Sequence, residues 1–314
     1  MTAAIGIDIG GTKVAAGVVD DAGRVQAILR RPTPGHEPAK VVDLIVDLVN
    51  LLAADHPVAA VGIGAAGLVD VERATVRFAA NLAWRDEPLR ADVAARVSLP
   101  VVIENDANAA AWGEYRFGAG DQQPDVVVLT IGTGIGGAII LDGRLHRGRF
   151  GAAGEPGHLR VVPNGLRCGC GNDGCLEQYS SGTALVRAAR EVARTRPADG
   201  CRMLELAGGD VSHIDGPVVT QAAREGDPAA VACFEEIGRW LGQGLADLAA
   251  ILDPGRFVIG GGVAEAGELL LAPARTEFAQ ALTGAGYRPL AEVVSARLGE
   301  QAGLIGAADL ARQP

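Results

Sequence analysis

The strongest constraint on the fold is a stretch that occurs twice. IGIDIGGTKVAAGVV at residues 5–19 and VVVLTIGTGIGGAII at 126–140 each join two runs of small and β-branched residues through a glycine turn. Laid over one another, they put Asp8 opposite Thr130 and Gly10 opposite Gly132. Two such runs separated by a glycine turn are typical of a β-hairpin. The repeat therefore predicts an internal duplication, with one hairpin in each half of the chain.

The rest of the chain alternates buried strands with amphipathic helices, the pattern of an α/β protein. Its 314 residues exceed what one hydrophobic core usually organises, so two domains are expected. Helices are predicted at about 39–54, 87–97, 107–117, 181–194 and 228–252, strands at 58–65, 101–106 and 257–263, and a C-terminal helix from about 300.

The overall charge limits the partners. A net charge of −10 disfavours nucleic acid and anionic membranes, because an acidic surface repels both. The N-terminus lacks the basic and apolar regions of a signal peptide, and no apolar run approaches the ~18 residues of a membrane span. We expect a cytoplasmic protein that binds any phosphate locally, through backbone amides and a metal.

The first glycine turn has the composition of a phosphate cradle. Gly10 and Gly11 let backbone N–H groups approach an anion, and Thr12 and Lys13 add a hydroxyl and a positive charge. The order is not that of a P-loop, because Thr12 stands between Gly11 and Lys13. Asp8 would repel phosphate unless Mg²⁺ lies between them, since Mg²⁺ is held by one or two carboxylates, phosphate oxygens and water. Asp8 is therefore a candidate magnesium anchor that would hold the metal through its bound waters, while the metal contacts the phosphates.

Two further glycine turns fit the same purpose. Gly132, Thr133 and Gly134 lie in the second hairpin, and Gly261 and Gly262 follow a predicted strand and precede a helix, as an adenosine-contacting turn would. The alternative for all three turns is close packing of strand against helix.

ENDANAAAWGE, at 104–114, places polar residues where a buried strand ends and a helix begins. Asp106 there has two interpretations. It is either the N-cap of the helix, whose side chain accepts a hydrogen bond from a free N–H group, or the general base that takes the proton of an attacking hydroxyl.

A metal site is predicted after the second hairpin. His158 is followed by Cys168, Cys170 and Cys175 in a glycine-rich segment, and three thiolates with one imidazole complete a tetrahedral zinc shell. With no open position, such a zinc is structural. The alternative is a set of reduced thiols with a surface histidine. Glu155 and Glu177 lie close to this cluster in sequence.

Seven segments in this order resemble the ROK family of sugar kinases and repressors, and within it the ATP-dependent bacterial glucokinases: DIGGTK, GAAGLVD, ENDANAAAWGE, IGTGIGG, GEPGH, CGCGNDGCLEQ and IGGGV. The resemblance spans essentially the whole chain. It implies an actin-like ATPase fold, a duplicated ribonuclease H-like fold, with nucleotide and sugar in the cleft between two domains. It also implies a discontinuous smaller domain of residues 1–118 plus 300–314 and a larger domain of 119–299 that carries the zinc.

The resemblance assigns a role to each matching residue. Asp106 would be the catalytic base for transfer from Mg–ATP to the 6-hydroxyl of D-glucose. The sugar contacts would be Gly67, through its backbone, with Asn105, Asp106, Glu155, His158 and Glu177. The phosphate and ATP contacts would be Asp8, Gly10, Gly11, Thr12, Lys13, Gly132, Thr133, Gly134, Gly261 and Gly262. The zinc ligands would be His158, Cys168, Cys170 and Cys175.

Two positions depart from the family pattern: Ala138 stands where relatives often have glycine, and Pro156 lies inside the Glu-x-Gly-His motif. Neither removes a ligand side chain. By analogy we expect a homodimer or homotetramer. Competing interpretations are a kinase for another hexose or N-acetylhexosamine, one that uses polyphosphate, an actin-like or chaperone ATPase, and a sugar-responsive repressor. The repressor is disfavoured because the first phosphate motif begins at residue 5, which leaves no room for a helix-turn-helix segment.

Overall fold

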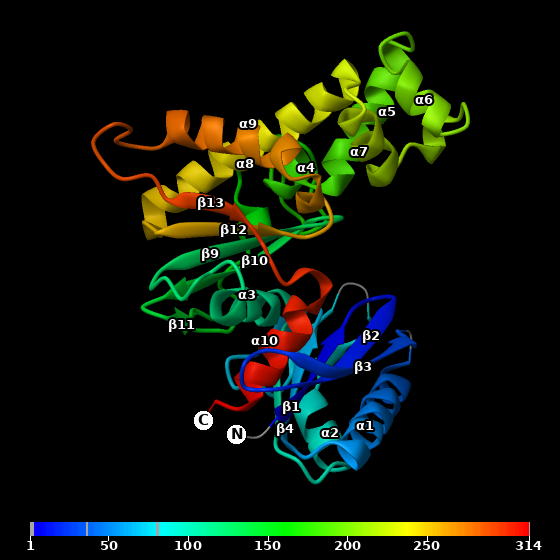
Figure 1. Cartoon of the computed structure of the whole chain (residues 1–314), viewed down its shortest axis with the longest axis vertical. Coiled ribbons are helices and arrows are strands. Elements are labelled where there is room, and N and C mark those ends of the chain that lie inside the picture. The colour runs from blue at the N-terminus through cyan, green and yellow to red at the C-terminus, as the bar shows by residue number, and fades with distance from the viewer. Residues whose placement is uncertain (1–2, 36, 80–81, 314) are drawn as a thin grey trace. The chain divides into compact units, whose positions relative to one another are not determined.

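The structure, a computed structural model, describes residues 3–35, 37–79 and 82–313 (Figure 1). Contacts divide the chain into two compact units. Unit 1 comprises residues 1–126, 138–154 and 296–314, and unit 2 comprises 127–137 and 155–295. The boundaries at 118 and 300 stay a prediction, because a grouping by contacts does not define where an independently folding domain ends.

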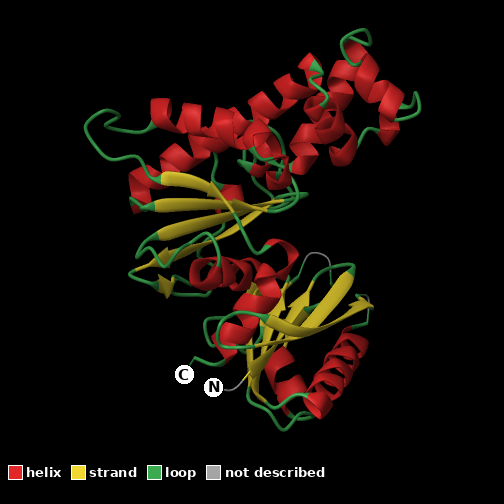
Figure 2. Ribbon diagram, viewed as in Figure 1, coloured by secondary structure: helices red, strands yellow, loops and turns green. Residues whose placement is uncertain are grey.

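The first sheet has the strand order β3-β2-β1-β4-β8. Its strands are β1 (Ala3–Ile9), β2 (Lys13–Val19), β3 (Val25–Pro32), β4 (Val58–Ala65) and β8 (Val101–Asn105). Figure 2 draws the strands in yellow between the red helices. β1, β2 and β3 pair antiparallel, whereas β1, β4 and β8 pair parallel. The carboxyl ends of the three parallel strands therefore meet at one edge, where Asp8, Gly67 and Asn105 lie.

The second sheet repeats this order as β11-β10-β9-β12-β13. Its strands are β9 (Val126–Ile131), β10 (Ile135–Leu141), β11 (Arg144–Leu145), β12 (Arg256–Gly260) and β13 (Glu292–Ser295). In each sheet, two strands joined by a glycine turn have a third strand on one side and two further strands on the other. The two further strands are parallel to each other in both sheets, β4 with β8 and β12 with β13. The two matching strand orders are those expected of the duplication.

Helices cover both faces of the first sheet. They are α1 (Pro38–Asp55), α2 (Leu89–Ala94), α3 (Asp106–Phe117) and α10 (Ala302–Ala311). Buried residues of α1 and α2 share one core with β1, β4 and β8, while α10 packs on β1, β4 and α3. This second contact is close because glycines remove side chains from it: a Cβ on Gly6 would overlap the Leu304 carbonyl, and one on Gly62 the Ala307 carbonyl. A small sheet, β5 (Leu68–Val69), β6 (Val76–Phe78) and β7 (Arg85–Glu87), completes unit 1.

Unit 2 is rich in helices: α4 (Glu177–Ser180), α5 (Gly182–Thr195), α6 (Cys201–Leu206), α7 (Gly216–Arg224), α8 (Pro228–Leu252) and α9 (Glu268–Ala281). α8 and α9 pack along one another over one face of the second sheet (Figure 1). Gly238 and Gly242 of α8 allow this close packing, because a Cβ on either would come too close to a backbone carbonyl of α9, that of Leu270 or that of Ala274.

The predicted elements are confirmed with small shifts at their ends. The helix expected at 87–97 is shorter, Leu89–Ala94, and the C-terminal helix begins at Ala302 after a 3₁₀ turn at Gly299–Gln301. The strand β3 and the helices α6 and α7 were not predicted, because apolar residues do not recur regularly over a long enough stretch in these segments. Within the described residues, no helix is both long and apolar enough to cross a membrane.

Candidate functional site

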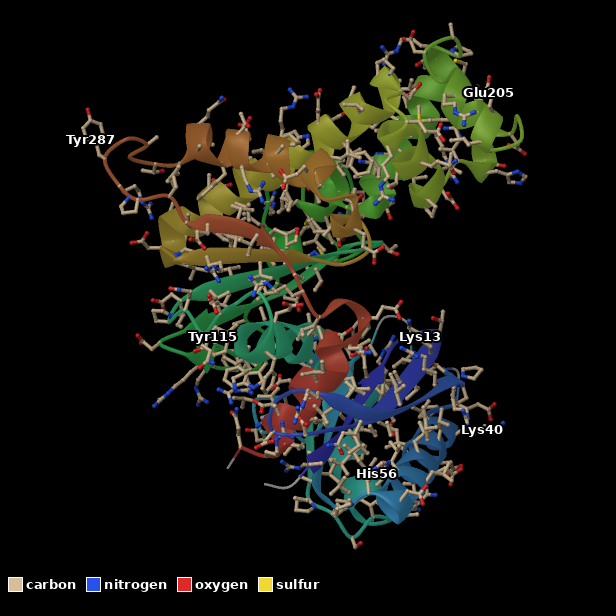
Figure 3. The ribbon with its side chains drawn as sticks, viewed as in Figure 1. Lys13, Lys40, His56, Tyr115, Glu205 and Tyr287 are labelled. Carbon is tan, nitrogen blue, oxygen red and sulfur yellow. The ribbon has the colours of Figure 1, made fainter. Side chains whose placement is uncertain are left out.

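The first glycine turn joins β1 to β2 and is fixed from the side by Thr33. The Gly10 N–H donates to the Lys13 carbonyl (3.0 Å), and Thr33 donates its hydroxyl to the Gly10 carbonyl (2.8 Å) and its N–H to the Thr12 carbonyl (3.0 Å). Lys13, labelled in Figure 3, is half exposed and lies 3.1 Å from Glu300 Oε2. Sequence reasoning missed Thr33 and Glu300, because both lie far from this turn along the chain.

Asp8 lies at the end of β1, partly covered by the start of α10. A Cβ on Gly303 would lie 3.1 Å from the Asp8 carboxyl carbon, so glycine is needed there for the helix to approach. Burial raises the pKa of Asp8 to about 6, and the negative charge of Asp106 adds to the rise, while Lys13 opposes it. The carboxylate is ionised at neutral pH but is poorly compensated by the groups around it, an arrangement that suits a cation.

Asn105 and Asp106 stand where β8 passes into α3. Asn105 is the N-cap, since its Oδ1 accepts from the Asn108 N–H (2.9 Å). The capping interpretation of Asp106 is therefore wrong: Asp106 is the first residue of the helix, and Asn105 already satisfies the N3 amide. The pKa of Asp106 is raised, mainly by burial.

Asn105 also brings Gly67 into the site. Its Nδ2 donates to the Gly67 carbonyl (2.9 Å) and to Asp106 Oδ1 (3.2 Å), and Asp106 Oδ1 accepts from the Ala107 N–H (2.9 Å). Gly67 has a φ of +143°, and a Cβ there would overlap the Phe78 carbonyl. Three predicted residues of unit 1 are thus joined in one hydrogen-bonded group.

In unit 2 the second and third glycine turns open onto one cavity of about 1180 Å³. Gly132, Thr133 and Gly262 line it, and Cβ atoms on Gly132 and Gly262 would meet no atom within 4 Å. Gly261, with a φ of +86°, packs against the backbone of Ile131 and links the two turns. Packing therefore does not require glycine at Gly132 or Gly262, both of which border open space.

The start of α5 closes one side of this cavity. The Gly182 N–H donates to the Gly132 carbonyl (2.8 Å), and the Thr183 hydroxyl donates to the Thr133 carbonyl (2.7 Å). Arginines of α5 and α7 also line it, namely Arg187, Arg190, Arg194 and Arg224. Sequence reasoning missed them, although the spacing 187, 190 and 194 places three cations on one face of a helix. Glu225 and Glu265 line the cavity as well, so the four arginines leave an excess of positive charge beside the backbone turns, which suits a polyphosphate.

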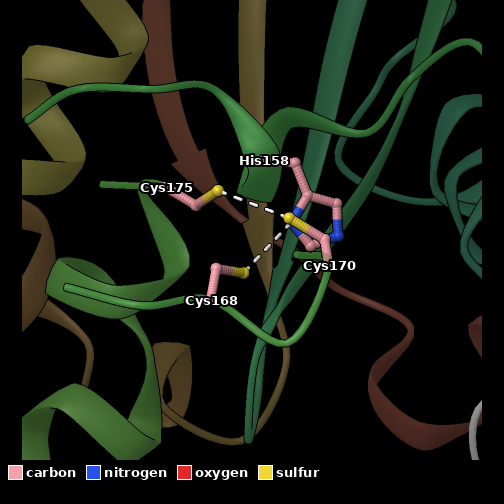
Figure 4. Close-up of side chains that lie close together, drawn as sticks. All are labelled: His158, Cys168, Cys170 and Cys175. Carbon is pink, nitrogen blue, oxygen red and sulfur yellow. Dashed lines mark hydrogen bonds between the residues drawn. The ribbon is translucent and has the colours of Figure 1, made fainter. Parts of the chain in front are cut away.

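The four predicted metal ligands lie together (Figure 4). Each of the four residues offers one ligand atom, and these atoms all lie within 4.8 Å of one another: His158, Cys168, Cys170 and Cys175. Cys170 Sγ is 3.6 Å from Cys175 Sγ, and Cys168 Sγ is 3.7 Å from His158 Nδ1. A tetrahedral zinc with bonds of about 2.3 Å has edges near 3.8 Å. The cluster therefore suits a structural zinc.

Glu177 connects this cluster with the second glycine turn. Cys168 Sγ donates to Glu177 Oε1 (2.9 Å), and the other carboxylate oxygen is 3.5 Å from the Ile135 N–H. A Cβ on Gly134 would lie 2.6 Å from that same oxygen, so a larger residue there would displace the Glu177 carboxylate. Glu155 precedes the 3₁₀ turn Pro156–His158, and its carbonyl accepts from the His158 N–H (3.1 Å). Pro156 packs on Gly137 of β10, so this departure from the family pattern fills space beside a glycine.

Comparison with known proteins identifies the family. The model of the ROK family matches residues 4–314. The chain belongs to the ROK family. Among ROK proteins, it is 52% identical over 310 residues to a glucokinase of Streptomyces coelicolor, covering 99% of this chain and 98% of that protein.

Solved ROK structures share the fold. A ROK family glucokinase from Streptomyces griseus, in complex with glucose and AMPPNP, is 55% identical and superposes with a TM-score of 0.89 over 99% of this chain and 100% of that one. A ROK hexokinase from Thermus thermophilus is 35% identical, with a TM-score of 0.80 over 98% of this chain and 97% of that one. The fold is thus the two-domain, actin-like fold of ROK sugar kinases.

Proposed function

We propose that the protein is an ATP-dependent glucokinase, which transfers the γ-phosphoryl group of Mg–ATP to the 6-hydroxyl of D-glucose. The observation that carries the proposal is the likeness, over nearly the full length of both chains, to a ROK glucokinase solved with glucose and AMPPNP. The hydrogen-bonded group of Gly67, Asn105 and Asp106 and the cavity at Gly132 and Gly262 support it independently.

Asp106 is the proposed base. It is the first residue of α3, and Asn105 is the N-cap of that helix. Asn105 Nδ2 and the Ala107 N–H both donate to Asp106 Oδ1 and hold it in place. Burial raises the pKa of its carboxyl, which makes the carboxylate a stronger acceptor for the hydroxyl proton as the bond to phosphorus forms.

The proposed sugar contacts are hydrogen-bonding groups. They are the side chains of Asn105, Glu155, His158 and Glu177, together with the backbone of Gly67. His158 turns Nδ1 toward Cys168, so its Nε2 is the nitrogen left for a sugar hydroxyl. Zinc would hold His158 in place and, through Cys175, which lies two residues before Glu177, would also place that carboxylate, which is a structural contribution.

The proposed donor contacts are the glycine turns. Backbone amides at Gly132, Thr133 and Gly134 would face phosphates, while Gly261 and Gly262 shape the cavity for the nucleoside. The turn of Gly10, Gly11 and Thr12, with Lys13, is also a proposed phosphate contact. Magnesium, when bound, neutralises phosphate charge, and the poorly compensated carboxylate of Asp8 fits it, through water. The proposal includes a cytoplasmic location. It also includes a homodimer or homotetramer, and sedimentation of the purified protein tests this oligomeric state.

The deciding experiment is ADP release by zinc-replete protein with Mg–ATP over glucose, mannose, fructose, N-acetylglucosamine and N-acetylmannosamine, with a control lacking sugar. We expect kcat/KM for glucose to exceed that for every other sugar. A preference for another sugar would overturn glucose as substrate but keep the kinase. Repeating the assay with polyphosphate in place of ATP tests the donor.

A further inference from the structure

Glu104 is a buried carboxylate that the proposed reaction does not yet use. It precedes Asn105 in β8, and only 3% of its surface is exposed. Its Oε1 accepts from the Asn105 N–H (3.1 Å) and from Asn108 Nδ2 (3.0 Å). Because Asn105 and Asn108 lie on either side of Asp106, one carboxylate oxygen holds both ends of the segment that carries the proposed base.

The other oxygen of Glu104 is held by two arginines. Arg147 approaches it with both Nε and Nη2 at 2.7 Å, and Arg73 Nε lies 3.5 Å away. Arg73 comes from the turn between β5 and β6, where its φ is +54°, and also donates to the Ile103 carbonyl (3.4 Å). Arg147 follows β11, in the stretch that precedes Glu155. Two loops from different parts of unit 1 thus converge on Glu104.

Stability alone explains this arrangement poorly. Desolvating a carboxylate and two guanidinium groups offsets most of their attraction, so hydrophobic residues of similar volume often stabilise a core as well. A carboxylate does something hydrophobic residues cannot: Glu104 accepts hydrogen bonds from three groups in fixed directions and attracts the charge of Arg73. Two of those groups belong to Asn105 and Asn108, and Asn105 in turn bonds Gly67 and Asp106.

We infer that Glu104, clamped by Arg147 and Arg73, is a positioning residue that holds Asn105 and Asp106 in the geometry needed for phosphoryl transfer. The inference rests on the proposed function. Misplacing reacting groups by about 1 Å can cost about 10²-fold in rate. Loosening Glu104 should therefore lower kcat while leaving the donor cavity of unit 2 unaffected.

The test compares Glu104→Gln and Arg147→Met with Glu114→Gln. Glu114 is a matched control: it is also a buried carboxylate of unit 1 (2% exposed), but it accepts from the N–H groups of Arg297 and Leu298. Both glutamine variants lose one buried charge at constant size. We measure kcat, KM for ATP and glucose, melting temperature, and hydrogen exchange of amides 105–108.

We expect Glu104→Gln and Arg147→Met to speed exchange at 105–108 and to lower kcat by about 10²-fold, with KM for ATP unchanged within about twofold. Glu114→Gln should lower the melting temperature without either effect. Guanidinium ion added to Arg147→Ala should restore part of kcat. Should Glu104→Gln not fold, Arg147→Lys, which keeps the charge but loses the two-bonded contact, carries the same expectation.

Unchanged exchange and kcat in folded Glu104 and Arg147 variants, or equal losses of kcat in Glu104→Gln and Glu114→Gln, would overturn the inference. Wild-type protein without glucose-dependent ADP release would instead overturn the proposed function, while hydrogen exchange at 105–108 still decides whether Glu104 fixes this segment.

Discussion

Asp8 and Asp106 stand at the carboxyl ends of strands in one parallel set, and the charge of Asp106 adds to burial in raising the pKa of Asp8 to about 6. Asp8 pairs in register with Gly64 of β4, and the next residue, Ala65, pairs with Asn105 of β8. Two carboxylates at such an edge repel each other unless a cation lies near them. This repulsion leads to the first prediction.

Asp8→Asn should make the protein more stable at pH 7. The folded pKa of Asp8, about 6, lies above its ordinary value of 3.8, so ionisation costs folding free energy. Below pH 3.8 the side chain is protonated in both states and the cost vanishes; it grows as pH rises to about 6 and is then constant. We expect a gain of the order of 2 kcal/mol at pH 7, measured by denaturant unfolding without Mg²⁺. A variant less stable than wild type at pH 7 would contradict this.

Asp106→Asn should lower kcat by ~10²- to 10⁴-fold while glucose affinity changes little. Asparagine keeps the acceptor for the Ala107 N–H but cannot take the hydroxyl proton. In the wild type, kcat/KM should fall as pH drops below about 6, because Asp8, whose pKa is about 6, then gains a proton. The pKa of Asp106 is also raised by burial, so its protonation adds to the fall at a higher pH than for an ordinary aspartate. Steady-state kinetics and calorimetry with glucose check both parts. Near-normal turnover would remove Asp106 from the role of base.

Gly262→Val should raise KM for ATP about 10-fold or more without lowering stability. Gly262 lines the donor cavity, and a Cβ there would meet no atom within 4 Å, so we expect the added side chain to obstruct the nucleotide and not the fold. Glucose affinity, measured without nucleotide, is the internal control. If KM for ATP stays at the wild-type value, the nucleotide does not occupy this cavity.

The purified protein should contain one zinc per chain, and Cys170→Ser should lower both the zinc content and the melting temperature. Cys201→Ser is the matched control, because Cys201 is also exposed but lies in α6, outside the cluster. Elemental analysis and thermal unfolding measure the two effects. A metal content below about half an equivalent in untreated protein would rule out a resident zinc.

Gly62→Ala should destabilise unit 1 by about 1–3 kcal/mol or more, because the added methyl group overlaps the Ala307 carbonyl of α10. Gly216→Ala, at the start of α7, is the control: its Cβ meets nothing within 4 Å and should change the free energy of unfolding by less than about 1 kcal/mol. Similar melting temperatures for the two variants would show that α10 does not need this contact.

Local sequence patterns predicted much of this site. Contacts between residues that lie far apart along the chain could not be predicted in this way. The hairpins, the cluster of His158 and three cysteines, and the residues Asn105 and Asp106 all follow from motifs within a few residues of one another. The bond of Glu104 to Arg147 joins residues 43 positions apart, and that of Thr33 to Gly10 joins 23. Neither has a local pattern. Whether Asp106 was the N-cap stayed open for a related reason: both Asn and Asp cap helices, and only the backbone shows which of the two precedes the first turn.

The position of α10 affects how the chain can fold during synthesis. Its residues, Ala302–Ala311, fill the space left by glycines of β1 and β4, which are made first. Synthesis proceeds at about 5–20 residues per second, so the first sheet waits several tens of seconds at the slow rate for its last helix. During that interval the apolar face that α10 later covers is open to chaperones and to other nascent chains.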